Sequence, residues 1–336
     1  MESTPLSLRL LERGRLPDGV IRWGIRRYLR QRLAQEHRGT PEAQQAHLMR
    51  FVAQLKESAI AIETHAANDQ HYEVPSRFFQ HALGPQLKYS CCYYATGHES
   101  LDDAEQAMLE LTVKRACIHD GERVLELGCG WGSLTLHMAQ RFPRSRITAL
   151  SNSRTQREFI LQRARERNLT NIEVLTCDAN VLQFPSGTQF DRIVSVEMFE
   201  HMRNYQQLLE RIASWLRPGG TLFVHIFTHR EYAYAFEVRD ASDWMARYFF
   251  SGGIMPSDDL LLYFQDHLTI RDHWRIDGRH YARTAEHWLT NMDRARGQIM
   301  PLFEQRYGAE AQKWWHYWRV FFMSCAELWG FNAGGE

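Results

Sequence analysis

Short apolar segments alternate with amphipathic segments from about residue 117 onward. Runs rich in Val, Leu and Ile predict strands, and intervening stretches with apolar residues three or four positions apart predict helices. The predicted strands are 123–127, 146–150, 172–177, 191–196 and 221–227, and the helices between them are 133–141, 154–167 and 204–216. This alternation predicts an α/β fold with a doubly wound, mostly parallel sheet that binds its ligand at the carboxyl ends of the strands.

The segments that flank this alternation have different patterns. Residues 1–65 have a helical pattern and predict an N-terminal extension to a main domain over 66–336. Residues 228–265 and 279–329 are rich in aromatic side chains and predict a mostly helical substrate cap. Residues 267–276 are a candidate sixth strand.

The predicted helix near the N-terminus is basic. No acid lies between Asp18 and Glu36, while arginines alternate with apolar residues; these arginines are Arg22, Arg26, Arg27, Arg30 and Arg32. Such a helix can lie on an anionic membrane through residues 19–34, or can pack its apolar stripe on the rest of the fold. We favour packing, because charge runs on helices are usually solvated faces.

Composition narrows the class of protein. Lys plus Arg and Asp plus Glu balance at 40 each, which argues against nucleic acid as the main partner. No apolar run approaches 18 residues, and the N-terminus lacks a signal-peptide pattern. The six cysteines show no metal-ligand spacing, so we expect reduced thiols, no metal and a cytoplasmic location. The sequence leaves the oligomeric state open, including a homodimer.

A glycine-rich turn follows the first predicted strand. The segment VLELGCGWG at 124–132 runs from apolar residues into three glycines at alternate positions, with Glu126 before the first of them. Glycines at a strand-to-helix turn let a ligand approach the backbone closely. The spacing differs from that of dinucleotide binders and resembles motif I of class I S-adenosylmethionine-dependent methyltransferases. The alternative is an ordinary glycine-rich turn.

Further motifs extend this resemblance in number and order. They are NDQHY at 68–72, YSCCY at 89–93, ELGCGWG at 126–132, VEMFEH at 196–201, FFSGG at 249–253, LYFQ at 262–265 and HYA at 280–282. From about residue 65 to its end the chain resembles the cyclopropane fatty acid synthase family of class I methyltransferases. It is most similar to the branch typified by coclaurine N-methyltransferase. Family members usually continue into a further strand of the sheet, so either this final strand is absent here or the sequence is a truncated form.

The resemblance implies S-adenosylmethionine as cofactor and assigns residues to it. Glu126 would accept from the α-ammonium group of the cofactor, and Gly128, Gly130 and Gly132 would allow close backbone approach. The remaining assignments are Asn152 and Gln156 to the ribose, Asp178 to the adenine amine with Ala179 and Asn180 beside the ring, and Tyr89 and Ser90 to a clamp over the methionine part. The alternatives are a helix cap for the residues near 152 and a turn former for Asp178.

Three polar residues after the fourth predicted strand suit methylation of an amine. An alkyl amine is protonated at neutral pH, so a nearby base must attract the ammonium group and accept its proton. Glu197, Glu200 and His201 supply such groups and, on a helix, would share one face. This cluster matches the acid-acid-His cluster of the N-methyltransferase branch. The alternative is a solvated helix start, where acids are favoured.

The resemblance also leaves a lipid-modifying alternative. Cyclopropane-forming relatives hold a bicarbonate base through positions that correspond to Cys91, Glu200, His225 and Tyr281, and generally carry a small residue at the position of Glu197. Because this chain has a carboxylate at position 197 in place of that small residue, we predict transfer of a methyl group to the nitrogen of a small, cyclic or aromatic amine. Cyclopropanation or methylation of unsaturated phospholipid acyl chains is the alternative. Aromatic residues that can cover a cation are expected mostly in the core; they are Phe249, Phe250, Trp288, Trp329 and Phe331.

Overall fold

The structure, a computed structural model, describes residues 6–62, 74–238 and 243–336. Five strands of the described chain form one parallel sheet in the order β3-β2-β1-β4-β5. They are β1 (Arg123–Leu127), β2 (Arg146–Ser151), β3 (Ile172–Thr176), β4 (Phe190–Val196) and β5 (Leu216–His225). The motif at 68–72 and the predicted domain boundary at 65 lie outside the described residues.

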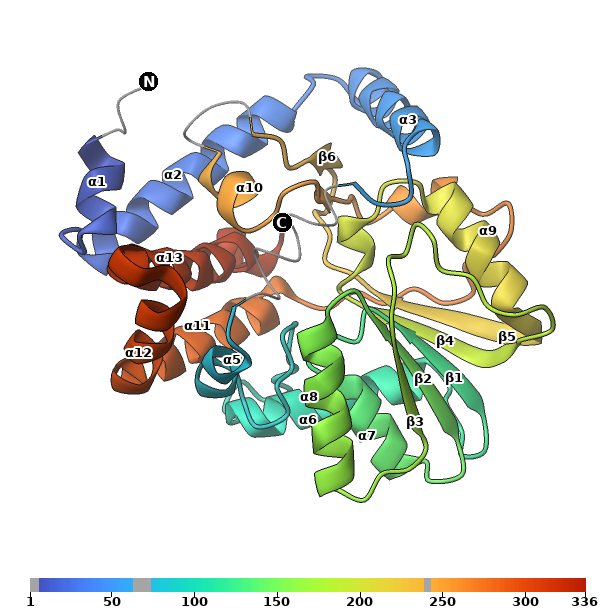
Figure 1. Ribbon diagram of the computed structural model, residues 1–336. Coiled ribbons are helices and arrows are strands. Elements are labelled where there is room, and N and C mark those ends of the chain that lie inside the picture. Colours follow the sequence, from blue (N-terminus) through green and yellow to red (C-terminus); the bar gives the residue numbers. More distant parts are fainter. Residues whose placement is uncertain (1–5, 63–73, 239–242) are drawn as a thin grey trace.

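Helices cover both faces of this sheet (Figure 1). Helices α6 (Leu101–Arg115), α7 (Ser133–Arg141) and α8 (Arg154–Glu166) pack on the face that carries Val124 and Ile147. Helices α3 (Pro41–Glu57) and α9 (Tyr205–Trp215) pack on the face that carries Leu125 and Ile193. Successive strand residues point to opposite faces, and both faces are apolar, as a parallel sheet covered on both sides requires.

The C-terminal third forms a helical layer beside this core. Helices α11 (Gly278–Arg294), α12 (Arg296–Tyr307) and α13 (Ala311–Trp329) pack together with α5 (Ser76–Ala82) around an aromatic cluster that includes Trp288 and Trp318. The helical prediction for 279–329 is therefore confirmed.

Two predictions on the cap are wrong. The described residues of the range 228–265, which are 228–238 and 243–265, hold only short elements: the two-stranded pair β6 (Tyr234–Ala235) and β7 (Ile254–Met255), helix α10 (Trp244–Tyr248) and a 3₁₀ turn at Leu260–Tyr263. Many aromatic residues of this range lie in irregular segments between these elements. Residues 267–276 form no strand; they run as coil, with Trp274 near Phe223 of β5 at 6.5 Å between ring centroids.

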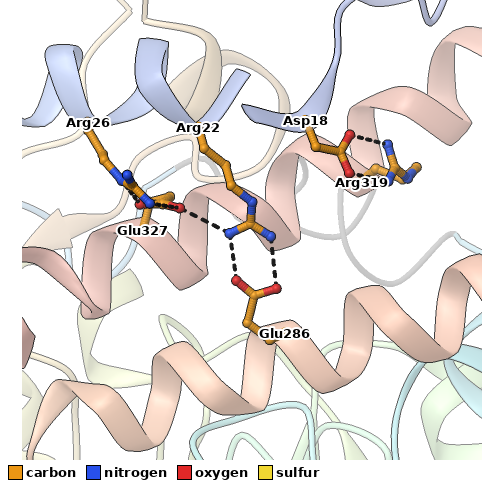
Figure 2. A network of polar contacts seen from close by, with 6 residues as sticks. All are labelled: Asp18, Arg22, Arg26, Glu286, Arg319 and Glu327. Carbon is orange, nitrogen blue, oxygen red and sulfur yellow. Dashed lines mark hydrogen bonds and ion pairs between the residues drawn. The ribbon is translucent and has the colours of Figure 1, made fainter. Parts of the chain in front are cut away.

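The N-terminal helices, α1 (Leu6–Glu12) and α2 (Asp18–Glu36), lie against the C-terminal helices. Arg22 donates to Glu286 of α11 at 2.6 Å and to Glu327 of α13 at 3.0 Å (Figure 2). Asp18 pairs with Arg319 of α13 at 2.8 Å. These contacts agree with the packing interpretation of the basic helix. Across the described ranges, no helix is long and apolar enough to span a membrane.

Candidate active site

The glycine turn lies between β1 and α7 and bends sharply. Gly128, Gly130 and Gly132 have positive φ values of 78°, 51° and 81°, which glycine adopts without strain. A Cβ at Gly128 would lie 2.9 Å from the side chain of Met198, so the backbone there has no room for one. Gly128 and Gly130 line the main cavity of the described chain, whereas Gly132 faces Ile160 and starts α7.

Glu126 is buried on β1 and faces this cavity. Its Oε2 accepts a hydrogen bond of 2.5 Å from the Thr135 hydroxyl of α7. Burial raises the pKa of Glu126 to about 8, because a carboxylate loses its hydration there. The group is therefore largely protonated at neutral pH until a positive charge arrives beside it.

The residues assigned to ribose and adenine largely share this cavity. Asn152, Gln156, Asp178 and Ala179 line it. Gln156 is buried and its Oε1 accepts from the Ser151 hydroxyl at 2.6 Å, while its Nε2 has no acceptor among the described residues. A buried amide donor that faces a cavity fits a hydroxyl-bearing ligand. The helix cap is Ser153, so capping does not explain Gln156.

Asn180 does not reach the cavity, contrary to its expected place beside the adenine ring. Its side-chain amide accepts from the Ala61 nitrogen at 3.0 Å and donates to the Ala61 oxygen at 3.1 Å. The Asn180 nitrogen donates to Asp178 Oδ1 at 2.7 Å. Asn180 therefore ties the N-terminal segment to the loop after β3, and Asp178 serves as turn former as well as lining residue.

Glu197 follows β4 in an unusual backbone conformation. Its φ is +48°, in the left-handed region, and its nitrogen donates to the His225 oxygen at 2.7 Å. The expectation that Glu197 shares a helix face with Glu200 and His201 is wrong, because the 3₁₀ turn covers only Phe199–His201. A strained non-glycine residue at a strand end is typical of functional sites.

Two donors hold the carboxylate of Glu197. The Cys91 nitrogen donates to Oε1 at 2.8 Å, and the Tyr281 hydroxyl donates to Oε2 at 2.6 Å. Burial raises the pKa of Glu197, while the charge of Lys88 and these two hydrogen bonds lower it. Glu197 and Tyr281 both line the cavity.

Glu200 and His201 lie on the same cavity wall. Glu200 is fully buried, and no other described residue donates to either of its carboxylate oxygens. Burial and the neighbouring Glu197 raise the pKa of Glu200 well above its usual range. The ring of His201 stacks on Phe250, with 4.5 Å between centroids.

The side chains of Cys91 and His225 are not among the cavity-lining groups. The Cys91 thiol donates to the Cys92 oxygen at 3.3 Å, and burial raises its pKa. Burial and the charges of Lys88 and Arg115 lower the pKa of His225 to about 3, so that its ring is neutral. Both residues meet Glu197 through their backbone.

Aromatic residues form part of the cavity wall. Tyr89, Phe250 and Trp288 line it together with Ser90. Trp329 stacks on Tyr281, with 5.1 Å between centroids and 5° between planes. Phe249 and Trp288 are buried, whereas Phe250, Trp329 and Phe331 are half-buried, so the expectation that most of this set lies in the core is wrong. The sequence pattern did not single out Lys88, which also lines the cavity and belongs to none of the quoted motifs.

Comparisons with known proteins agree along nearly the whole chain. The family model described as mycolic acid cyclopropane synthetase matches residues 61–332. The chain is 43% identical to (S)-coclaurine N-methyltransferase of Thalictrum flavum subsp. glaucum over 98% of this chain and 92% of that protein. It is 28% identical to cyclopropane-fatty-acyl-phospholipid synthase of Escherichia coli (strain K12) over 71% of this chain and 59% of that protein.

A solved structure has the same fold. The crystal structure of coclaurine N-methyltransferase bound to N-methylheliamine and SAH superimposes with a TM-score of 0.94 and 41% identity. The match covers 98% of this chain and 96% of that chain. The doubly wound fold predicted from the sequence is confirmed.

Proposed function

The chain belongs to the mycolic acid cyclopropane synthetase family and is an S-adenosylmethionine-dependent methyltransferase, and we propose that it methylates the nitrogen of a small cyclic or aromatic amine. The observation that carries this proposal is the held carboxylate of Glu197. It lies in the cavity beside Glu200, and its two donors come from segments far apart in the chain.

The cofactor supplies an activated methyl group when bound. Glu126 would accept from its α-ammonium group, and the backbone at Gly128 and Gly130 would approach it closely. Gln156 offers its unpaired Nε2 to a ribose hydroxyl, and Asp178 would accept from the adenine amine. Each group has the chemistry that its proposed partner requires.

The two carboxyl groups have different tasks in this proposal. An amine must enter as a cation and lose its proton before its lone pair can attack. Two carboxyl groups in one buried site do not both ionise easily, and no other described residue donates to Glu200, so this proposal assigns the proton to Glu200. Glu197, whose ionised form is favoured by the hydrogen bonds from Cys91 and Tyr281, would attract the ammonium group and take its proton. The ring of His201 lines the same cavity as the two carboxyl groups.

The hydrogen bonds and the charge of Glu197 argue against the lipid alternative. In cyclopropane-forming relatives, positions that correspond to Cys91 and Tyr281 hold bicarbonate. Here both residues donate to the carboxylate of Glu197. A second anion beside it would add a buried like charge, which is costly. The similar proteins named coclaurine N-methyltransferase also support an amine.

The test is a labelling assay with two variants. The enzyme is incubated with methyl-labelled cofactor, a panel of primary, secondary and tertiary cyclic amines, and monounsaturated phospholipid vesicles. We expect label in an amine, and Glu197→Gln should lower kcat by about 10²–10⁴-fold, the usual contribution of a general base. The control is Glu210→Gln, an exposed site on α9. Labelled phospholipid, or amine turnover unchanged in Glu197→Gln, would refute the proposal.

Membrane contact through α2 stays a separate prediction. The exposed face of the helix carries Trp23, which is 59% exposed, with the guanidinium of Arg27 5.8 Å from its ring. Flotation of the full chain with anionic vesicles tests it. Flotation that is lost in Trp23→Ala would support the contact, and no flotation of the wild type would remove it.

A further inference from the structure

We infer that Lys88 is a positioning residue that keeps Glu197 in place and in its proton-accepting form, an inference that rests on the proposed function. No motif points to this residue. Its side chain is only 3% exposed, which is rare for a lysine unless polar partners hold it.

The geometry joins Lys88 to Glu197 through a short segment of backbone. The Nζ of Lys88 donates to Ser90 Oγ at 2.5 Å and to the Cys91 oxygen at 2.7 Å. The Cys91 nitrogen in turn donates to Glu197 Oε1 at 2.8 Å. The ammonium group therefore fixes the residue whose N–H holds the proposed base.

A second carboxylate fixes the other end of this segment. Glu105 of α6 is fully buried and accepts from the nitrogens of Gln86 at 2.8 Å and Lys88 at 3.2 Å. Gly84 leaves room for it, because a Cβ there would lie 2.5 Å from the Glu105 carboxyl group. The Lys88 side chain thus extends from a braced backbone and has little freedom to leave the site.

Among the described groups that affect the pKa of Glu197, the positive charge is that of Lys88. The other described titratable groups near Glu197 are neutral or acidic: Cys91 and Cys92 in the same segment as Lys88, Glu200 after β4, Tyr281 on α11 and Cys325 on α13. His225 of β5 contributes its backbone oxygen, and its ring is neutral. Lys88 therefore supplies the positive charge that opposes the desolvation of the Glu197 carboxylate.

The sign of the effect follows from these charges. Loss of the Lys88 charge raises the pKa of Glu197, because an opposite charge nearby favours the ionised form. A protonated Glu197 cannot accept the proton of the amine. The acidic limb of the pH profile of kcat should therefore move to higher pH when the charge is removed.

The experiment compares neutral and charged replacements in the full-length enzyme. We expect Lys88→Gln and Lys88→Met to move the acidic limb upward by about one pH unit, and Lys88→Arg to restore it. Lys88→Gln in the Glu197→Gln background should cause no further shift. Binding of S-adenosylhomocysteine verifies that each variant is folded. A lower rate with an unmoved limb would assign Lys88 a merely structural role and overturn the inference.

An infrared titration separates this inference from the proposed function. The difference spectrum between wild type and Glu197→Gln, with ¹³C-labelled glutamate, reports the ionisation of Glu197 without turnover. We expect its midpoint to rise in Lys88→Gln. If wild-type Glu197 itself is protonated at pH 8, Lys88 does not keep it ionised and the inference fails, whether or not a neutral variant folds. If Glu197→Gln retains full activity, the proposed function fails instead, while the titration still tests Lys88.

Discussion

The buried carboxyl group of Glu126 makes cofactor binding depend on pH. Burial raises its pKa to about 8 in the free enzyme, against an ordinary value of 4.5. At pH 7 such a group is roughly nine-tenths protonated. The cofactor's α-ammonium group would favour the ionised form, so binding should release a proton.

The size of this effect follows from the same pKa. Release at pH 7 should approach one proton, about 0.9 for a pKa of about 8. The apparent affinity for S-adenosylhomocysteine should fall roughly 50-fold between pH 8 and pH 6, since the fraction ionised falls by that factor. Glu126→Gln removes the titrating group and a charge-assisted hydrogen bond of about 3 kcal/mol, so binding should be at least about 100-fold weaker than in the wild type at pH 8 and lose most of its pH dependence.

Titration calorimetry in two buffers of different ionisation enthalpy measures the proton count directly. The matched control is Glu158→Gln, an exposed site on α8, which should release protons as the wild type does. Binding to the wild type without proton release at pH 7 would refute the reasoning. Equal proton release by Glu126→Gln would show that another group is responsible.

Three further predictions concern residues that hold Glu197, the N-terminal helices and the glycine turn in place. Tyr281→Phe removes a donor to Glu197, so its pKa should rise and kcat at pH 7 should fall about tenfold, measured as a pH profile. Glu327→Gln removes the negative charge that Arg22 and Arg26 share on α13, while Arg22 keeps Glu286, and should lower the free energy of unfolding by about 1 kcal/mol, less so at high salt, measured by denaturant titration. Gly132→Ala places a Cβ at 2.6 Å from Ile160 with a positive φ, so the free energy of unfolding should fall by about 1–3 kcal/mol in the same assay; an unchanged value would contradict the close contact.

The sequence predicted the central sheet closely because each strand is a compact apolar run with a turn beside it. The bounds of β1 and α7 are those expected, and the start of β5 is the main difference. The strand was expected at 221–227, but β5 begins at Leu216 and includes Pro218, Gly219 and Gly220, with an irregular register opposite β4. Glycine and proline can occupy a bulge as well as a turn, and local sequence does not distinguish the two.

The site was predicted as a set of residues but not as a geometry. The glycines, Glu126 and the acids after β4 follow motifs that a single sequence can show. The left-handed Glu197, the amide of Asn180 bound to Ala61 and the buried Lys88 depend on partners from other parts of the chain. Neither the hydrophobic periodicity nor the motif spacing predicts those partners.

The strand segments, the glycine turn and the acids after β4 can be predicted from the sequence alone, because they depend on the local apolar pattern and on residue type. Only the tertiary structure decided which groups hold the Glu197 carboxylate. Lys88 and Cys91 come from the segment before α6 and Tyr281 comes from α11, and folding brings both segments to the Glu197 carboxyl group. The ionisation of a buried acid depends on its desolvation and on the charges around it, and both exist only in the folded chain.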